Sequence, residues 1–294
     1  MKARNAITIK QNVNDHSRIG PNKRNKNAAA AVEIEKVILD NALLPTTYDV
    51  SCIQPNYFSE FTYFDCLNGV LLATMSAEVT AIAMEEAVNQ CTKVDYGLVD
   101  KLLDSINDKY QLGSPTLSHL PEDVIFMAGG NLFKAMNKEI IDREMLYNPN
   151  CVIKAHPVTN DDALRALGVR YGYHRIIDPK ESGMEYLKAA KNVFTASNSE
   201  LGLVAAALEK NIINITAVKH EPILTYSSIY RLFTNDKEHN YEVLAKVLSS
   251  PISGLIMPFH EDKEQRVKDY CEFTLELREY FRPRYPANIY KSEI

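Results

Sequence analysis

The sequence predicts an α/β fold built around a parallel sheet in the second half of the chain. From residue 123 to residue 216, short apolar runs alternate with longer segments that have the length of helices. The short runs have the length of buried strands, and the longer segments carry apolar residues three or four positions apart. Turn-forming residues such as Gly129 and Gly130 separate the two kinds of segment. Strands that alternate with helices form a parallel sheet that is covered on both faces.

Five strands and four helices are expected in this central stretch. The expected strands are 123–128, 151–155, 174–177, 192–196 and 211–215, and the expected helices are 132–142, 161–167, 183–190 and 198–210. Ligands of such sheets bind beyond the carboxyl ends of the strands. That rule selects three loops, Gly129-Gly130-Asn131, His156-Pro157-Val158-Thr159 and Ser197-Asn198-Ser199-Glu200. Their glycine, hydroxyl and amide groups suit a ligand that carries phosphates.

The rest of the chain is expected to form a smaller first domain and a helical end. Strands are expected at 6–10, 48–53 and 70–74, helices at 28–43, 78–91 and 95–110, and an aromatic segment lies at 55–66. Residues 113–119 have the composition of a linker, so we place the domain boundary between 1–118 and 119–294. After residue 216 we expect helices at 226–233, 241–249 and 264–281, with a strand at 251–257.

Composition predicts a globular protein of the cytosol. Hydrophobic residues make up 46% of the 294 residues, and the five cysteines form no Cys-x-x-Cys pair. An odd number of scattered cysteines indicates neither a disulfide framework nor a zinc site. The first residues hold no apolar run of signal-peptide length, and no run of about 18 apolar residues occurs anywhere, so stable membrane insertion is not expected.

Charge is distributed unevenly along the chain. Residues 1–26 hold seven lysines or arginines and one aspartate, which is a net charge of +6, so the remainder carries −11 of the total of −5. This asymmetry favours an anionic partner near Arg18, Lys23 and Arg24. The alternative interpretation is a solvated basic arm without a partner.

Several common catalytic motifs are missing from the sequence. It contains no phosphate loop, no Gly-x-Gly-x-x-Gly turn, no Gly-x-Ser-x-Gly elbow and no His-Glu-x-x-His. It also lacks an Asp-x-Asp pair, so we predict neither a metal nor a cofactor. If phosphates bind here, backbone amides and polar or cationic side chains must hold them.

Two segments carry a resemblance to a known family. Lys154-Ala-His156-Pro157 ends a predicted strand, and Thr195-Ala-Ser197-Asn198-Ser199-Glu200-Leu-Gly202 follows about 40 residues later. This pair resembles the donor half of GT-B glycosyltransferases, most of all the bacterial sialyltransferase and capsule sugar transferase groups. The resemblance implies two Rossmann-like domains that face each other across a cleft, with the N-terminal domain reduced here. It also implies that the C-terminal domain holds a CMP- or UDP-linked sugar and that the last helix crosses back.

The resemblance implies roles for individual residues. Ser197, Ser199, the amides at the start of the 198–210 helix and His156 would stabilise the departing phosphate. The turn at Gly129-Gly130 would let the backbone approach the ligand, and Lys154 and Lys219 are further candidates for the donor site. The family takes its general base from the N-terminal domain, where the candidates are Glu78 and then Asp65 and Glu60.

Each of these residues also has an interpretation without a ligand. Ser197-x-x-Glu200 matches a capping box, His156-Pro157 matches the end of a strand, and Lys154 matches a surface lysine. The glycine pair matches a tight turn, and Glu78 matches a first-turn residue that favours the helix dipole.

The sequence therefore favours a metal-independent glycosyltransferase that uses a nucleotide sugar and a hydroxyl acceptor. The basic N-terminal segment fits an anionic acceptor, such as a saccharide chain or modified DNA. Two alternatives remain open: a sugar-nucleotide 2-epimerase of the same fold, and a non-enzymatic nucleic-acid-binding module. The −11 charge of the remainder opposes the last of these, because it repels a phosphate backbone.

Overall fold

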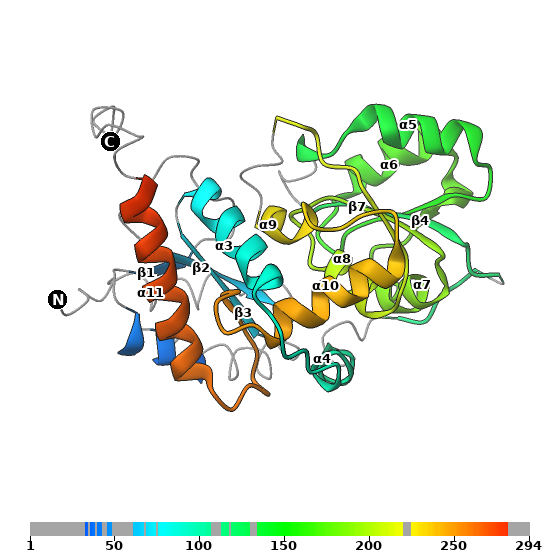
Figure 1. Ribbon diagram of the computed structural model, residues 1–294. Helices are drawn as coiled ribbons and strands as arrows, with labels where there is room; N and C mark the ends of the chain where they lie inside the picture. The colour runs from blue at the N-terminus through cyan, green and yellow to red at the C-terminus, as the bar shows by residue number, and fades with distance from the viewer. Residues whose placement is uncertain are drawn as a thin grey trace, which may run out of the picture. The chain divides into compact units, whose positions relative to one another are not determined.

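The chain divides into two compact units. Unit 1 comprises Met1–Lys101 together with Ala245–Ile294, and unit 2 comprises Leu102–Leu244. The computed structural model describes residues 33–34, 36–38, 40–42, 46–48, 61–67, 69–74, 76–106, 113–117, 119–129, 134–219 and 225–281 (Figure 1). The expected strand at 6–10 and the basic residues Arg18, Lys23 and Arg24 lie outside these residues. Within the described parts of the chain, every helix is too short or too polar to span a membrane.

Unit 2 contains the parallel sheet that the sequence predicts. Its described elements are β4 (Asp123–Phe126), α5 (Lys138–Tyr147), β5 (Val152–Lys154), α6 (Asp161–Tyr171), β6 (Ile176–Ile177), α7 (Gly183–Ala189), β7 (Asn192–Thr195), α8 (Leu201–Ala207), β8 (Asn211–Asn214) and α9 (Ser227–Tyr230). The five described strands are all parallel and lie in the order β6-β5-β4-β7-β8. Helices α5 and α6 cover one face of this sheet, and α7 and α8 cover the other (Figure 1). The predicted α/β class is therefore confirmed.

Helices α5 and α8 of unit 2 both begin later than predicted. Helix α5 begins at Lys138, because the side chain of Asn137 accepts hydrogen bonds from the amides of the first turn. The predicted helix from residue 132 was therefore placed too early. Helix α8 is shorter than the predicted 198–210, because residues 197–198 form a turn and Glu209 adopts a positive φ of 51°.

The core of unit 2 lies between the sheet and the α5 and α6 helices. Inward residues of the strands meet apolar residues of α5, which are spaced for one helix face. The buried members of this cluster are Ile125, Met127, Ala128, Met136, Ile141, Met145, Cys151, Ile153, Phe194, Ala196 and Ile215. This packing fixes the strand ends from which the candidate site is built.

Unit 1 contains a mixed sheet. Its described strands are β1 (Thr46–Tyr48), β2 (Phe61–Cys66), β3 (Gly69–Thr74) and β9 (Leu255–Ile256). β1 pairs parallel to β2, whereas β2 with β3 and β3 with β9 are antiparallel. This differs from the parallel sheet of the expected Rossmann-like N-terminal domain, because a tight hairpin joins β2 directly to β3.

The end of the chain belongs to unit 1. Strand β9 pairs with β3, and α11 (Lys263–Phe281) packs against α3 (Ala77–Asn89). Residues 245–294 therefore group with residues 1–101, whereas the sequence had suggested a second domain of 119–294. Helices α4 (Gly97–Ile106) and α10 (Lys237–Ser249) each contain a boundary between the units.

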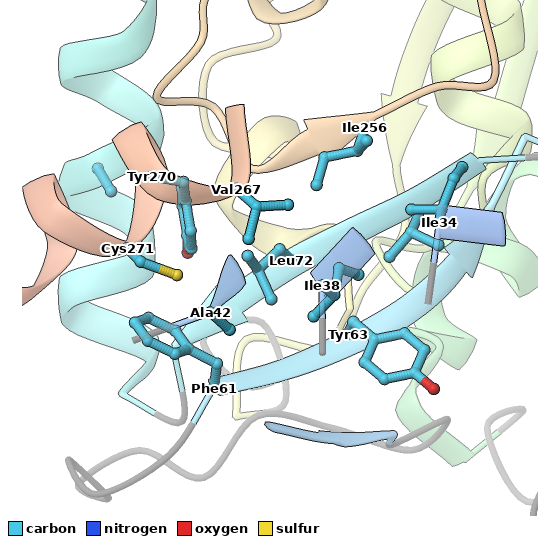
Figure 2. Close-up of a cluster of buried hydrophobic side chains, with 12 residues drawn as sticks. Ile34, Ile38, Ala42, Phe61, Tyr63, Leu72, Ile256, Val267, Tyr270 and Cys271 are labelled. Atoms are coloured by element: carbon cyan, nitrogen blue, oxygen red, sulfur yellow. The ribbon is translucent and has the colours of Figure 1, made fainter. Parts of the chain in front are cut away.

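Residues far apart in the sequence form the core of unit 1 (Figure 2). Side chains of the helical segment 33–42, of β2 and β3, and of β9 and α11 point toward one another. The labelled members are Ile34, Ile38, Ala42, Phe61, Tyr63, Leu72, Ile256, Val267, Tyr270 and Cys271. Burial of this apolar surface joins residues between 34 and 83 with residues between 256 and 271 in one unit.

Candidate functional site

The strand order of unit 2 defines a switch point at the carboxyl ends of β4 and β7. These two strands are neighbours, but the chain leaves β4 toward α5 on one face and leaves β7 toward α8 on the other. Loops that diverge in this way open a crevice, and ligands of α/β sheets bind there. Two of the three predicted loops follow β4 and β7, and the third, with His156, follows the adjacent strand β5.

Gly129 and His156 lie in direct contact at this edge. A Cβ atom added to Gly129 would lie 2.6 Å from Nδ1 and 2.7 Å from Cε1 of the His156 ring. No real Cβ approaches a ring atom this closely, so only glycine allows the imidazole to take this position. Both residues are half-buried. Two of the predicted site residues are therefore brought together by the fold.

The imidazole of His156 is a neutral hydrogen-bond donor. Its Nδ1 accepts a hydrogen bond from the amide of Val158 at 3.2 Å, which assigns the ring proton to Nε2. Burial lowers the pKa of His156, the positive charge of Lys154 lowers it further, and Glu200 opposes both. This environment favours the neutral ring, which donates through Nε2.

Ser197 lies inside the protein. Its side chain is fully buried, and its Oγ lies 3.1 Å from the hydroxyls of Thr216 and Ser227. Its amide also donates to Thr216 Oγ1 at 2.8 Å. The hydroxyl therefore holds the β7 loop to the segment after β8 and to α9. This differs from the predicted phosphate contact, because interior partners already occupy the group.

Ser199 and Glu200 form the start of α8. The amide of Leu201 donates to Ser199 Oγ at 3.3 Å, and Glu200 is the cap residue without a side-chain hydrogen bond to the helix. The predicted capping box of Ser197 and Glu200 is therefore wrong, because the turn at 197–198 places the helix start three residues later. Beside them, Asn198 Oδ1 is buried and has no hydrogen-bond partner among the described residues.

Lys154 is not at the surface. Its side chain is 3% exposed, and its Nζ donates to the carbonyls of Ala155 at 2.8 Å and Pro179 at 3.3 Å. The prediction that this ammonium contacts a ligand directly does not fit this geometry. The alternative prediction of a surface lysine does not fit it either. Thr195, also in the predicted donor motif, is fully buried and pairs with Asn214 in the sheet.

The remaining predicted residues are divided between the units. Pro157 and Lys219 of unit 2 are exposed, and Gly130 and Asn131 lie outside the described residues. Glu78 of unit 1 is exposed in the first turn of α3, where Ser76 accepts from the amide of Val79. Asp65 lies in β2 opposite Val70, and its side chain is outside the described residues.

Sequence reasoning missed a cavity of about 370 Å³ between α5 and α6. Its lining includes Met127 and Val158, so it adjoins the loops after β4 and β5. Asp142 of α5 and Arg170 of α6 also line the cavity. They form an ion pair in which Arg170 Nε and Nη2 donate to Asp142 at 2.8 and 2.6 Å. No sequence signal marks this cavity, because its lining combines residues of two helices with residues of the loops after β4 and β5.

Glu181 was also missed, although it is 7% exposed. Its carboxylate accepts hydrogen bonds from the amide of Thr116 at 2.9 Å, from the Thr116 hydroxyl at 2.8 Å and from Tyr186. Burial raises the pKa of Glu181, but these hydrogen bonds and the charge of Lys154 outweigh it, so the net pKa is lowered. An acidic residue that follows a strand and precedes a helix start was the available signal.

No protein-family model matches this chain, and no curated protein matches it. Among the residues that the structure describes, no three His, Cys, Asp or Glu side chains gather in a way that could hold a metal ion. The candidate site is therefore defined by the topology of the sheet and by the contact of Gly129 with His156.

Proposed function

We propose that this protein is a metal-independent glycosyltransferase that moves a sugar from a CMP- or UDP-linked donor to a hydroxyl acceptor. The donor phosphates bind at the carboxyl ends of β4, β5 and β7 in unit 2. The contact of Gly129 with His156 at the switch point is the observation that supports this proposal. The missing side chain of Gly129 is what lets the imidazole of His156 reach the backbone at this edge of the sheet.

The proposed chemistry requires hydrogen-bond donors more than a positive charge. Transfer of the sugar leaves negative charge on the departing phosphate, and preorganised donors stabilise that charge in the transition state. The Nε2 proton of His156 supplies one donor, and backbone amides of the loops after β4 and β7 supply others. Because the ring is already fixed by Val158 and Gly129, little reorganisation is needed when the charge develops.

Activation of the acceptor is assigned to unit 1 in this proposal. Glu78 is the first candidate for the general base, and Asp65 is the second. Arg18, Lys23 and Arg24 would attract an anionic acceptor, such as a saccharide chain or modified DNA. A two-domain arrangement of GT-B type is part of the same proposal.

A nucleotide panel tests the donor site. We expect one of CMP, UDP, GDP or ADP to raise the melting temperature, because a ligand that binds only the folded state stabilises it by about 2.7 kcal/mol at 100 times its Kd. His156→Ala should abolish the shift. His119→Ala is the matched control, since His119 is an exposed histidine that precedes β4.

Activity then tests the reaction itself. Donor turnover with a hydroxyl acceptor should be lost in His156→Ala and reduced in Glu78→Gln. A panel in which no nucleotide changes the melting temperature, or a full shift in His156→Ala, would refute the donor site. Donor binding without transfer to any hydroxyl acceptor would leave a nucleotide-binding protein and would refute the glycosyltransferase.

A further inference from the structure

A single buried ammonium group connects two loops of the ligand edge. Lys154 is the last residue of β5, and its Nζ donates to the carbonyl of Ala155, the residue directly before His156. The same Nζ donates to the carbonyl of Pro179, in the loop between β6 and α7. The loop that presents His156 is therefore tied to its neighbour through one side chain.

A carboxylate balances this ammonium and extends the connection. Burial lowers the pKa of Lys154 to about 8, and the negative charges of Glu181 and then Asp178 oppose that shift. Glu181 in turn accepts both hydrogen bonds of Thr116. Backbone hydrogen bonds join the same segments, from the Gly113 amide to Lys180 and from the Ser182 amide to Gly113.

Apolar packing alone would not select a lysine at this position. Burying an ammonium is unfavourable unless its hydrogen bonds and a counter-charge are supplied, and a residue such as methionine would fill the space without that cost. Here two carbonyls and Glu181 supply them. The arrangement therefore indicates a role that requires the charge.

We propose that Lys154 is a positioning residue of the ligand edge: its ammonium locks the His156 loop to the β6–α7 loop, and Glu181 holds the β6–α7 loop to the segment 113–117. The positive charge of Lys154 also favours the neutral imidazole of His156, which Glu200 opposes from the loop after β7. Only the expected effect of Lys154 on nucleotide binding rests on the proposed function. The expected effect of Lys154 on the pKa of His156 does not depend on that function.

The titration of the His156 imidazole, followed by NMR, tests the electrostatic part without any nucleotide. In Lys154→Met the pKa of His156 should rise by about one unit, because a neighbouring positive charge has been removed. Lys154→Arg should restore the lower value. In Glu181→Gln the pKa of His156 should fall further, since the charge that balances Lys154 is lost. Lys191→Met is the control, because Lys191 is exposed and pairs with Glu122.

The two opposite shifts separate this role from a purely structural one. Loosening of the fold would move the His156 pKa in the same direction in Lys154→Met and Glu181→Gln. An unchanged pKa in a folded Lys154→Met, or shifts of equal sign in the two variants, overturns the proposal. If Lys154→Met does not fold, the other two variants still test the proposal. Lys154→Arg must keep the low pKa of His156, and Glu181→Gln must lower that pKa further.

Nucleotide binding by the same variants links the inference to the function. Lys154→Met should weaken the binding of the nucleotide that stabilises the parent protein by about tenfold, and Lys154→Arg should recover most of it. If nucleotide binds equally well to Lys154→Met and His156 titrates unchanged, the positioning role is wrong and the donor site stands. If no nucleotide binds but His156 responds as expected, the positioning role stands and the donor site is wrong.

Discussion

Acidification should destabilise unit 1 through His260, which lies in the loop between β9 and α11. Its side chain is 3% exposed, and its Nδ1 accepts a hydrogen bond from the Met257 amide at 3.1 Å. Burial first, and then the positive charge of Arg266, lower the pKa of His260 to about 3, although Asp262 opposes them. In the unfolded chain the same ring titrates near its ordinary value of 6.5.

The magnitude follows from these two pKa values. Below about pH 6.5 the His260 ring binds a proton in the unfolded chain but stays neutral in the folded chain. The free energy of unfolding therefore falls as the pH falls. The loss is about 1.4 kcal/mol for each pH unit in this range. Between pH 7.5 and pH 5.0 His260 should therefore remove about 2 kcal/mol. The folded ring remains neutral throughout this interval.

Urea unfolding of the parent protein and of His260→Asn, each at pH 7.5 and pH 5.0, measures this loss. The asparagine retains an oxygen that can accept from the Met257 amide and has no group that titrates. Stability should fall by about 2 kcal/mol less in the variant than in the parent over this interval. An equal fall in both proteins, or a folded His260 ring that titrates near 6.5 by NMR, would refute the reasoning.

Three substitutions test other parts of the structure. Arg266→Met removes a buried guanidinium that donates to three carbonyls at the end of α10, so unit 1 should lose roughly 3 kcal/mol in urea unfolding. Gly129→Ala places a Cβ against the His156 ring, and should cost about 1–3 kcal/mol of stability and weaken any nucleotide-induced shift in melting temperature. Gly202→Ala brings a Cβ to 2.0 Å from the hydroxyl of Tyr230, and should cost a similar 1–3 kcal/mol without changing the titration of His156. Wild-type melting temperatures in these variants would contradict the corresponding contacts.

The elements of unit 2 were predictable because their signals are local. Each strand is a short apolar run and each helix is a segment of matching period, so neighbouring residues decide the type. The bounds were less predictable. The start of α5 depends on the side chain of Asn137, and the end of α8 depends on the positive φ of Glu209. Neither feature changes the apolar period of the segment.

Unit 1 was less predictable because its signals are not local. In β2 the aromatic residues Phe61, Tyr63 and Phe64 are all buried, so the strand shows no alternation of apolar and polar residues. The pairing of β9 with β3 joins positions near opposite ends of the chain. A pattern confined to a window of residues carries no information about such a partner.

The candidate site was predictable in its location but less so in its details. The rule for parallel sheets placed Gly129 and His156 on one edge, and the structure brings them into contact. The direction of the Ser197 side chain could not be inferred, because it depends on Thr216 and Ser227, which come from later segments. The buried state of Lys154 depends in the same way on the loop after β6.

The order in which the units can form during synthesis follows from the way the chain is divided. Residues 102–244 make up unit 2 without interruption, so they leave the ribosome before the last segment of unit 1 exists. Until β9 emerges, β3 has β2 on one side and an uncovered edge on the other. In a nascent chain that ends before residue 245, chaperones should therefore engage unit 1, while unit 2 can already fold.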